Sequence, residues 1–314
     1  MLLRFQRCFF VRGVLVLGIC LLVSLFQDET IVVAMVPTTP ATPSNHNAPP
    51  PLVWRPKPPR RRKQSIQLLA DRALAIRRQN LHLPFVCIGV AGGPGSGKST
   101  LTANVATWIN NNARNATNHD GQSISKEKAV VIPMDGYHYS KEQLREMAGT
   151  EEAYESLLRK RGSPPTINAP QLVEDFQALD TFRRRNANAE PAEMPTFPDY
   201  SRQQSDPVPN ALTIPSDTTI VFCEGLYVLA FDSPNWAPLQ EIWDDTVFLS
   251  VSEVKLKERL IGRHMKRWTK AKRDLWGPGR NGAAAKVEAN DLQNARWVTQ
   301  HSQHHAQVIL HNYF

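Results

Sequence analysis

Short, continuously apolar runs alternate with longer stretches of mixed polarity over residues 65–314. The apolar runs predict buried β-strands at residues 85–90, 128–134, 219–229 and 245–251. Apolar positions three and four residues apart predict helices at 65–79, 99–110, 140–147, 151–161 and 170–185, and further helices from about 255 and 290. The asparagine-rich stretch 110–128 and the polar, proline-rich stretch before residue 219 are interpreted as loops. Strands that alternate with helices predict an α/β fold, with a parallel sheet between two layers of helices.

The first 64 residues do not share this alternation. Residues 13–26 are continuously apolar and follow three arginines, but a membrane span needs about 20 such residues. They fit the core of a cleaved targeting signal, with an uncleaved anchor as the second interpretation and a mitochondrial presequence as the third. Residues 1–35 are therefore predicted to be a targeting signal or membrane anchor. Nine prolines between Pro37 and Pro59, followed by a basic run, predict a linker over 36–64, or the second part of a bipartite organelle signal.

These leader interpretations predict entry into the secretory route, import into a plastid or mitochondrion, or anchoring at a membrane through residues 1–35. The sequon at Asn115 would matter only on the secretory route. Most of the net charge of +8 lies in residues 1–63, which hold nine Lys and Arg residues against two acidic ones. The remaining chain is nearly neutral, so the overall basicity does not predict a nucleic-acid partner. Cys87 and Cys223 fall in apolar runs, which predicts buried, reduced thiols rather than a disulfide framework.

A glycine-rich segment joins the first predicted strand to the helix that follows it. It fits the pattern G-x-x-x-x-G-K-[ST] with residues Gly92, Gly93, Pro94, Gly95, Ser96, Gly97, Lys98 and Ser99, and Thr100 follows. Its backbone N–H groups would cradle phosphates, Lys98 would contribute positive charge, and the Ser99 hydroxyl would bind Mg²⁺. The segment therefore predicts a P-loop NTPase-type fold that binds ATP. No guanine-binding Asn-Lys-x-Asp motif and no ABC signature motif follows. A GTPase and an ABC ATPase are therefore less favoured.

Two carboxylates stand at or near the ends of apolar strands: Asp135 in MDGYH and Glu224 in VFCEG. Ligands gather at the carboxyl ends of strands in open α/β sheets, so both are expected beside the phosphate loop. From the residues alone, either could hold magnesium through a water molecule while the other acts on an acceptor. If one accepts a hydroxyl proton, the reaction is phosphoryl transfer to an alcohol.

The predicted helix from Lys255 is strongly basic, with nine Lys and Arg residues and the single acid Glu258 over residues 255–273. Arg259 and Arg263 lie four residues apart, on one helical face. We interpret this segment as a helical lid whose arginines close over the triphosphate. A membrane-surface or nucleic-acid-binding helix is the competing interpretation, but Leu256, Leu260 and Ile261 favour a face packed on the domain.

Seven segments follow one another in a specific order over about residues 66–312: GGPGSGKST, PMDGYHYS, KRGSPPTINAPQL, PDYSRQQSDPVPNAL, VFCEGLYVL, RLIGRHMKRW and EANDLQNARWV. Together they resemble the phosphoribulokinase/uridine kinase family. The resemblance is to the uridine-kinase-like branch with poorly defined substrates, which is related to the bacterial-type pantothenate kinases.

The resemblance implies a role for several residues of this chain. Asp135 would be the general base, Glu224 would serve magnesium together with Ser99, and Arg259 and Arg263 would be lid arginines. It further implies that the acceptor pocket is lined by Tyr137 and His138, with Tyr200 and Arg202 reaching it. Asn290 and Asn294 would lie near the nucleotide base.

Two departures from the family pattern affect the acceptor. Relatives usually have T-F-D where this chain has Thr166-Ile167-Asn168, and E-G-N-Y where it has Glu224-Gly225-Leu226-Tyr227. Phosphoryl transfer should survive both changes, but the substrate choice of the relatives should not be transferred to this chain. The predicted activity is therefore ATP- and Mg²⁺-dependent phosphorylation of a small alcohol: a nucleoside, a sugar, a sugar phosphate or a pantothenate-like compound. The alternatives are a regulatory P-loop ATPase without a small acceptor and an inactive, membrane-tethered module.

Two further groups of residues are given structural interpretations. His301, His304 and His305 have a spacing that could hold a metal, but no carboxylate or cysteine accompanies them in the sequence. They are interpreted as part of a solvated C-terminal helix. The residues Arg183, Arg184 and Arg185 end a predicted helix, where cations suit the helix dipole.

Overall fold

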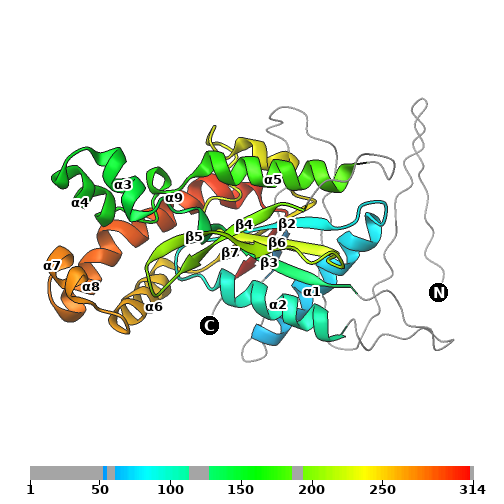
Figure 1. Ribbon diagram of the computed structural model, residues 1–314. Helices are drawn as coiled ribbons and strands as arrows, with labels where there is room; N and C mark the ends of the chain where they lie inside the picture. The colour runs from blue at the N-terminus through cyan, green and yellow to red at the C-terminus, as the bar shows by residue number, and fades with distance from the viewer. Residues whose placement is uncertain (1–51, 55–60, 113–126, 186–193, 312–314) are drawn as a thin grey trace. The chain divides into compact units, whose positions relative to one another are not determined.

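The computed structural model describes residues 52–54, 61–112, 127–185 and 194–311 (Figure 1). The predicted targeting segment 1–35 and residue Asn115 lie outside the described residues, so these expectations stay predictions. No helix within the described ranges combines the length and the apolar character that crossing a membrane requires.

A parallel sheet forms the centre of the described part of the chain, with the strand order β1-β8-β7-β2-β6-β3. Its strands are β1 (Leu52–Trp54), β2 (Val86–Ala91), β3 (Ala129–Pro133), β6 (Ile220–Gly225), β7 (Asp245–Ser250) and β8 (Val308–His311). Four of these, β2, β3, β6 and β7, lie within one residue of the apolar runs identified in the sequence or inside them. The predicted parallel α/β fold is therefore confirmed.

Helices cover both faces of this sheet, as Figure 1 shows. Helices α1 (Arg61–Gln79) and α2 (Lys98–Asn112) lie on one face, and α5 (Ala169–Arg184) and α9 (Leu292–Ser302) lie on the other. Alternate residues of β2 supply the two cores, because successive side chains of a strand point to opposite faces. Ile88 packs in the core under α1 and α2, and Cys87 packs in the core under α5. Both Cys87 and Cys223 are buried free thiols, as predicted, and burial raises the pKa of Cys87 to about 12.

The basic segment after β7 forms a separate group of helices at one end of the sheet (Figure 1). These are α6 (Glu253–Met265), α7 (Lys270–Trp276) and α8 (Gly279–Lys286), and α3 (Lys141–Ala148) and α4 (Glu151–Arg159) lie at the same end. The prediction of one long helix from Lys255 is wrong. Thr269 caps a new helix by accepting a hydrogen bond from the Lys272 N–H, and Gly277 with Pro278 ends it.

The segment interpreted as a polar loop contains an antiparallel hairpin, so that interpretation is wrong. Strands β4 (Thr196–Ser201) and β5 (Asp206–Thr213) pair with each other outside the main sheet. Prolines interrupt both strands, and β5 is largely exposed, so neither carries the alternating apolar pattern that identifies a strand. Two edge elements were also missed: β8 beyond the last helix, and β1, whose three residues lie in the predicted linker and pair with β8.

The arginines at the end of α5 do not share one role. Arg184 is exposed, as the dipole interpretation expects, but Arg183 is only 2% exposed. Its guanidinium donates hydrogen bonds to Asp180 at 2.7 Å, to the backbone oxygen of Ile242 at 2.7 Å, and to the Asp244 carboxylate. Arg183 therefore ties α5 to the segment that enters β7.

Candidate active site

The glycine-rich loop connects the end of β2 at Ala91 to the start of α2 at Lys98. Gly95 has a backbone φ of 74°, which L-residues with a side chain rarely adopt. A Cβ on this glycine would lie 3.0 Å from the side chain of Leu260 in α6. The loop therefore packs directly against the predicted lid. The loop residues Gly92, Gly93, Pro94 and Ser96 are buried, Gly97 is half-buried, and Ser99 and Thr100 are exposed.

The sheet register brings the two predicted carboxylates to the same end as this loop. Strand β6 lies between β2 and β3, and Glu224 pairs in register with Val90 on one side and Pro133 on the other. Asp135 follows Pro133 by two residues, in the short 3₁₀ helix η2 (Met134–Tyr137). The hairpin passes tightly over this turn, because a Cβ on Gly136 would lie 2.3 Å from the Pro198 backbone oxygen. Asp135 and Glu224 therefore lie on the same side of the loop, at the carboxyl edge of the sheet.

Lys98 and Glu224 form a desolvated pair of opposite charges within this edge. Lys98 is 8% exposed, and its Nζ donates to the Gly93 backbone oxygen at 3.3 Å. Burial lowers the pKa of Lys98, while the charges of Glu224 and Asp135 act to raise it. Burial raises the pKa of Glu224, opposed by Lys98 and by a hydrogen bond with the Ser99 side chain. Glu224 therefore interacts with Lys98, Asp135 and Ser99, and Lys98 also interacts with Asp135.

Both predicted lid arginines belong to α6, and of the two Arg263 acts electrostatically on Lys98. The Nη2 atom of Arg259 is buried and has no hydrogen-bond partner among the described residues. Burial lowers the pKa of Arg259, and the exposed Arg263 is close enough for its charge to lower the pKa of Lys98. Buried cationic groups that lack anionic partners are stabilised by a bound anion. These residues therefore fit a polyphosphate held by the loop.

The predicted acceptor residues divide into two groups. The rings of His138 and Tyr200 lie 5.1 Å apart at an angle of 51°, and the charge of Asp135 acts on the pKa of both side chains. Arg202 is exposed in the turn between β4 and β5, and its charge acts to lower the pKa of Glu224. Tyr137, in contrast, is 2% exposed and donates its hydroxyl hydrogen bond to Asp175 on α5 at 2.7 Å. Tyr137 is therefore a core residue that fixes the turn carrying Asp135.

Asn290 and Asn294 lie where the π-helical turn η5 (Val287–Asp291) runs into α9. Both are buried, and Asn294 Nδ2 donates to Asn290 Oδ1 at 3.3 Å. Asn290 Nδ2 in turn donates to the Arg161 backbone oxygen at 3.0 Å. Their amides thus connect α9 to the segment after α4, and their predicted place near a nucleotide base stays a prediction.

Comparisons with known proteins bear on this arrangement. No protein-family model matches the chain. It is 29% identical over 184 residues to "Putative uridine kinase C227.14" of Schizosaccharomyces pombe, covering 59% of this chain and 68% of that protein. It is also 29% identical over 190 residues to "ATP-dependent kinase YFH7" of Zygosaccharomyces rouxii, covering 54% of this chain and 48% of that protein. The matched stretch thus spans 68% of the length of the first relative and 48% of the length of the second.

Two solved structures share the fold. The "putative fructose transport system kinase" from Silicibacter sp. TM1040 superposes with a TM-score of 0.57 at 26% identity, covering 78% of this chain and 98% of that one. YFH7 from Saccharomyces cerevisiae superposes with a TM-score of 0.64 at 18% identity, covering 79% and 99%. In sequence and in fold, the chain is similar to uridine-kinase-like P-loop kinases, and these similarities support that family. The resemblance on which the sequence analysis relied is thereby confirmed.

In this uridine-kinase-like chain, the structure identifies a candidate site residue that the sequence analysis did not single out. Arg161 donates from Nη2 to Asp206 at 2.9 Å, and its Cζ lies 5.9 Å from the Tyr200 ring centroid. Its Nε and Nη1 atoms are buried and have no hydrogen-bond partner in the described ranges. The charge of Arg161 also acts on the pKa of His138. The KRGSPPT segment contained this residue, but nothing in its local pattern distinguished it from a surface arginine.

We predict a pH-dependent contribution of His138 to the stability of this uridine-kinase-like chain. Burial lowers the pKa of His138, despite the opposing charge and backbone contact of Asp135. Below the unfolded value of about 6.5, the unfolded chain therefore binds more protons than the native chain, and this contribution is lost as pH falls. The urea-unfolding free energy should rise with pH in this window, and His138→Gln should make the rise shallower. The exposed His82→Gln is the control, and an equal slope in both variants would contradict the prediction.

Proposed function

We propose that this chain is an ATP- and Mg²⁺-dependent kinase that transfers the γ-phosphoryl group to a hydroxyl of a small metabolite. One observation carries the proposal: the sheet register places Glu224 and the turn that holds Asp135 at the same end as the phosphate loop, where both charges act on Lys98. The kinase names of the relatives and their shared P-loop fold support it. A carboxylate that is free of the metal is the group that removal of a proton from an acceptor hydroxyl requires.

The proposed chemistry assigns a separate task to each of these side chains. Asp135 takes the proton of the acceptor hydroxyl, whose oxygen bonds to the γ-phosphorus while the bond to the bridging oxygen breaks and ADP leaves. Lys98, Arg259 and Arg263 offset the negative charge of the phosphoryl oxygens. Ser99 and Glu224 would hold Mg²⁺, which supplies further charge neutralisation when it is bound.

The surroundings of Asp135 bear on which alcohol is the acceptor. Arg161 pairs with Asp206 through Nη2, and its guanidinium also acts on the pKa of His138 and Tyr200. Its Nε and Nη1 atoms are buried and meet no acceptor in hydrogen-bonding geometry among the described residues. An acceptor with anionic oxygens would satisfy these donors, and a charge-assisted hydrogen bond is about twice as strong as a neutral one. Among the alcohols considered above, a sugar phosphate or a carboxylate-bearing, pantothenate-like alcohol is therefore favoured over an uncharged nucleoside.

The test is an acceptor panel with the full chain, ATP and Mg²⁺, in which ADP release and the phosphorylated product are measured together. The panel pairs each uncharged alcohol with an anionic counterpart: sugars with sugar phosphates, and pantetheine-like with pantothenate-like compounds. We expect at least one acceptor to accelerate ADP release with equal formation of product, and Arg161→Met to reduce the preference for the anionic member. Basal hydrolysis that no acceptor accelerates would contradict the proposal and support a regulatory ATPase instead.

A further inference from the structure

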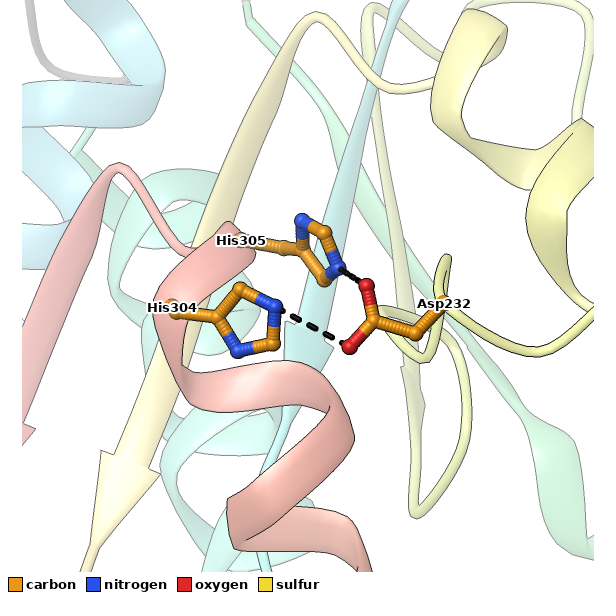
Figure 2. A group of neighbouring side chains, drawn as sticks. All are labelled: Asp232, His304 and His305. Carbon is orange, nitrogen blue, oxygen red and sulfur yellow. Dashed lines mark hydrogen bonds and ion pairs between the residues drawn. The ribbon is translucent and has the colours of Figure 1, made fainter. Parts of the chain in front are cut away.

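Three polar side chains meet at a place remote in sequence from the phosphate loop. His304 and His305 belong to the short 3₁₀ helix η6 (Gln303–His305) that follows α9, and Asp232 lies in the turns after β6. His305 Nε2 is 2.7 Å from one carboxylate oxygen of Asp232, and His304 Nε2 is 3.1 Å from the other, as Figure 2 shows. His304 is exposed, as the interpretation of a solvated helix expects, but the statement that no carboxylate accompanies these histidines does not hold in the fold. The fold supplies the carboxylate that the local sequence lacks.

We propose that Asp232, His304 and His305 form a binding site for a divalent transition metal, with Zn²⁺ as the best match. Two imidazoles and one carboxylate are a ligand set that Zn²⁺ uses in proteins, with water completing a tetrahedral site. Each residue offers one ligand atom, and these atoms all lie within 4.8 Å of one another. The inference concerns a site separate from the proposed magnesium ligands Ser99 and Glu224, and it does not depend on the kinase proposal.

The observed spacing requires little movement to admit a metal. Ligand atoms about 2.0–2.2 Å from a tetrahedral Zn²⁺ lie roughly 3.3–3.5 Å from each other. The two nitrogen-to-oxygen distances of 2.7 and 3.1 Å would therefore widen by less than about 1 Å. A third histidine stands beside the site, since His301 Nδ1 is 3.8 Å from Asp232 Oδ2. That nitrogen is buried and has no hydrogen-bond partner among the described side chains and backbone.

Packing fixes the rings before any metal binds. The His305 ring lies 5.0 Å from the Phe231 ring and 4.0 Å from the His304 ring. The backbone oxygen of His305 accepts a hydrogen bond from the Thr246 hydroxyl at 3.0 Å, which anchors it to β7. Ligands that are already ordered lose less conformational entropy on binding. The two exposed members, His304 and Asp232, leave the site open to solvent and hence to an incoming ion.

A metal at this position would join two segments that lie 73 residues apart along the chain. One is the turn that follows the strand carrying Glu224, and the other is the end of α9, whose first turns carry Asn294. Bound metal should therefore stabilise the junction between the sheet and α9. At metal concentrations above the dissociation constant, the temperature of thermal unfolding should rise with the logarithm of the metal concentration.

The test is Zn²⁺ binding to the full chain, freed of metal by a chelator and without nucleotide, measured by calorimetry. Co²⁺ serves as a second probe, because its visible absorption reports tetrahedral coordination. We expect saturable binding, weakened more than about tenfold both in Asp232→Ala and in His304→Ala/His305→Ala, since even partners of metal ligands commonly contribute 10–100-fold to affinity. His82→Ala, an exposed histidine elsewhere, is the matched control and should bind like the wild type.

Two outcomes would overturn the proposal. One is the absence of saturable Zn²⁺ binding by the wild type. The other is that the Asp232 and histidine variants bind as tightly as His82→Ala. His304→Ala alone provides a check against misfolding, because more than half of the side-chain surface of His304 is exposed. Circular dichroism should show an unchanged fold in that variant, and it should still lose the Co²⁺ absorption band.

Discussion

Replacing Asp135 with asparagine should reduce turnover with the acceptor by about 10²–10⁴-fold while leaving ATP affinity nearly unchanged. Asparagine keeps the size of the side chain but cannot take the proton of the acceptor hydroxyl. The phosphate loop, Lys98 and Glu224 remain in place, so the groups that would bind ATP are intact. The measurements are kcat in the coupled ADP assay, with the acceptor that the panel identifies, and the dissociation constant of ATP from calorimetry.

The matched control is Glu142→Gln, which removes an exposed carboxylate from the first turn of α3, seven residues after Asp135. It should leave kcat within about twofold, because exposed charges are screened by water and salt. Unchanged turnover in Asp135→Asn would show that Asp135 is not the base. Loss of ATP affinity along with turnover would instead show that this carboxylate organises the nucleotide site.

Replacing Arg183 with methionine should lower the free energy of unfolding by about 3–5 kcal/mol, which is the usual effect of removing one partner of a buried ion pair. Arg183 bonds to Asp244 and to the Ile242 backbone oxygen, and Asp244 also accepts a hydrogen bond from the Cys87 N–H at 2.7 Å. The substitution leaves the Asp244 carboxylate without its cation next to the central strand β2. Equilibrium unfolding in urea measures the change.

Arg184→Met is the matched control, since Arg184 is the next residue and also pairs with Asp180, at 2.8 Å, but is exposed. It should lower stability by no more than about 1 kcal/mol. The double variant Arg183→Met/Asp244→Asn should recover part of the loss, because an amide oxygen can still accept from Cys87 without leaving a buried charge. Equal effects of the two single variants would refute a special role for the buried guanidinium.

The strands that position the phosphate loop and the two carboxylates were predictable because β2 and β6 are buried throughout and no residue of β3 is exposed. Such strands appear in the sequence as continuous apolar runs, and the residues at their ends can be identified directly. The hairpin β4–β5 was not predictable in this way, because its prolines and exposed polar residues carry no period of two. The division of the basic segment into α6, α7 and α8 depended on a cap at Thr269 and on Gly277, which are weak signals in a strongly helical pattern.

The sequence by itself determined the phosphate loop, the α/β alternation and the candidate chemistry of Asp135 and Glu224, because each depends on residues that are close together in the chain. Only the tertiary structure decided what surrounds them: that Arg161 faces His138 and Tyr200, that Arg183 is buried against Asp244 61 residues away, and that Asp232 meets two histidines. Local periodicity reports which face of an element is buried, but it does not report which distant side chain packs against that face. Pairing across the fold is therefore determined by packing and charge compensation, which emerge only when the chain is folded.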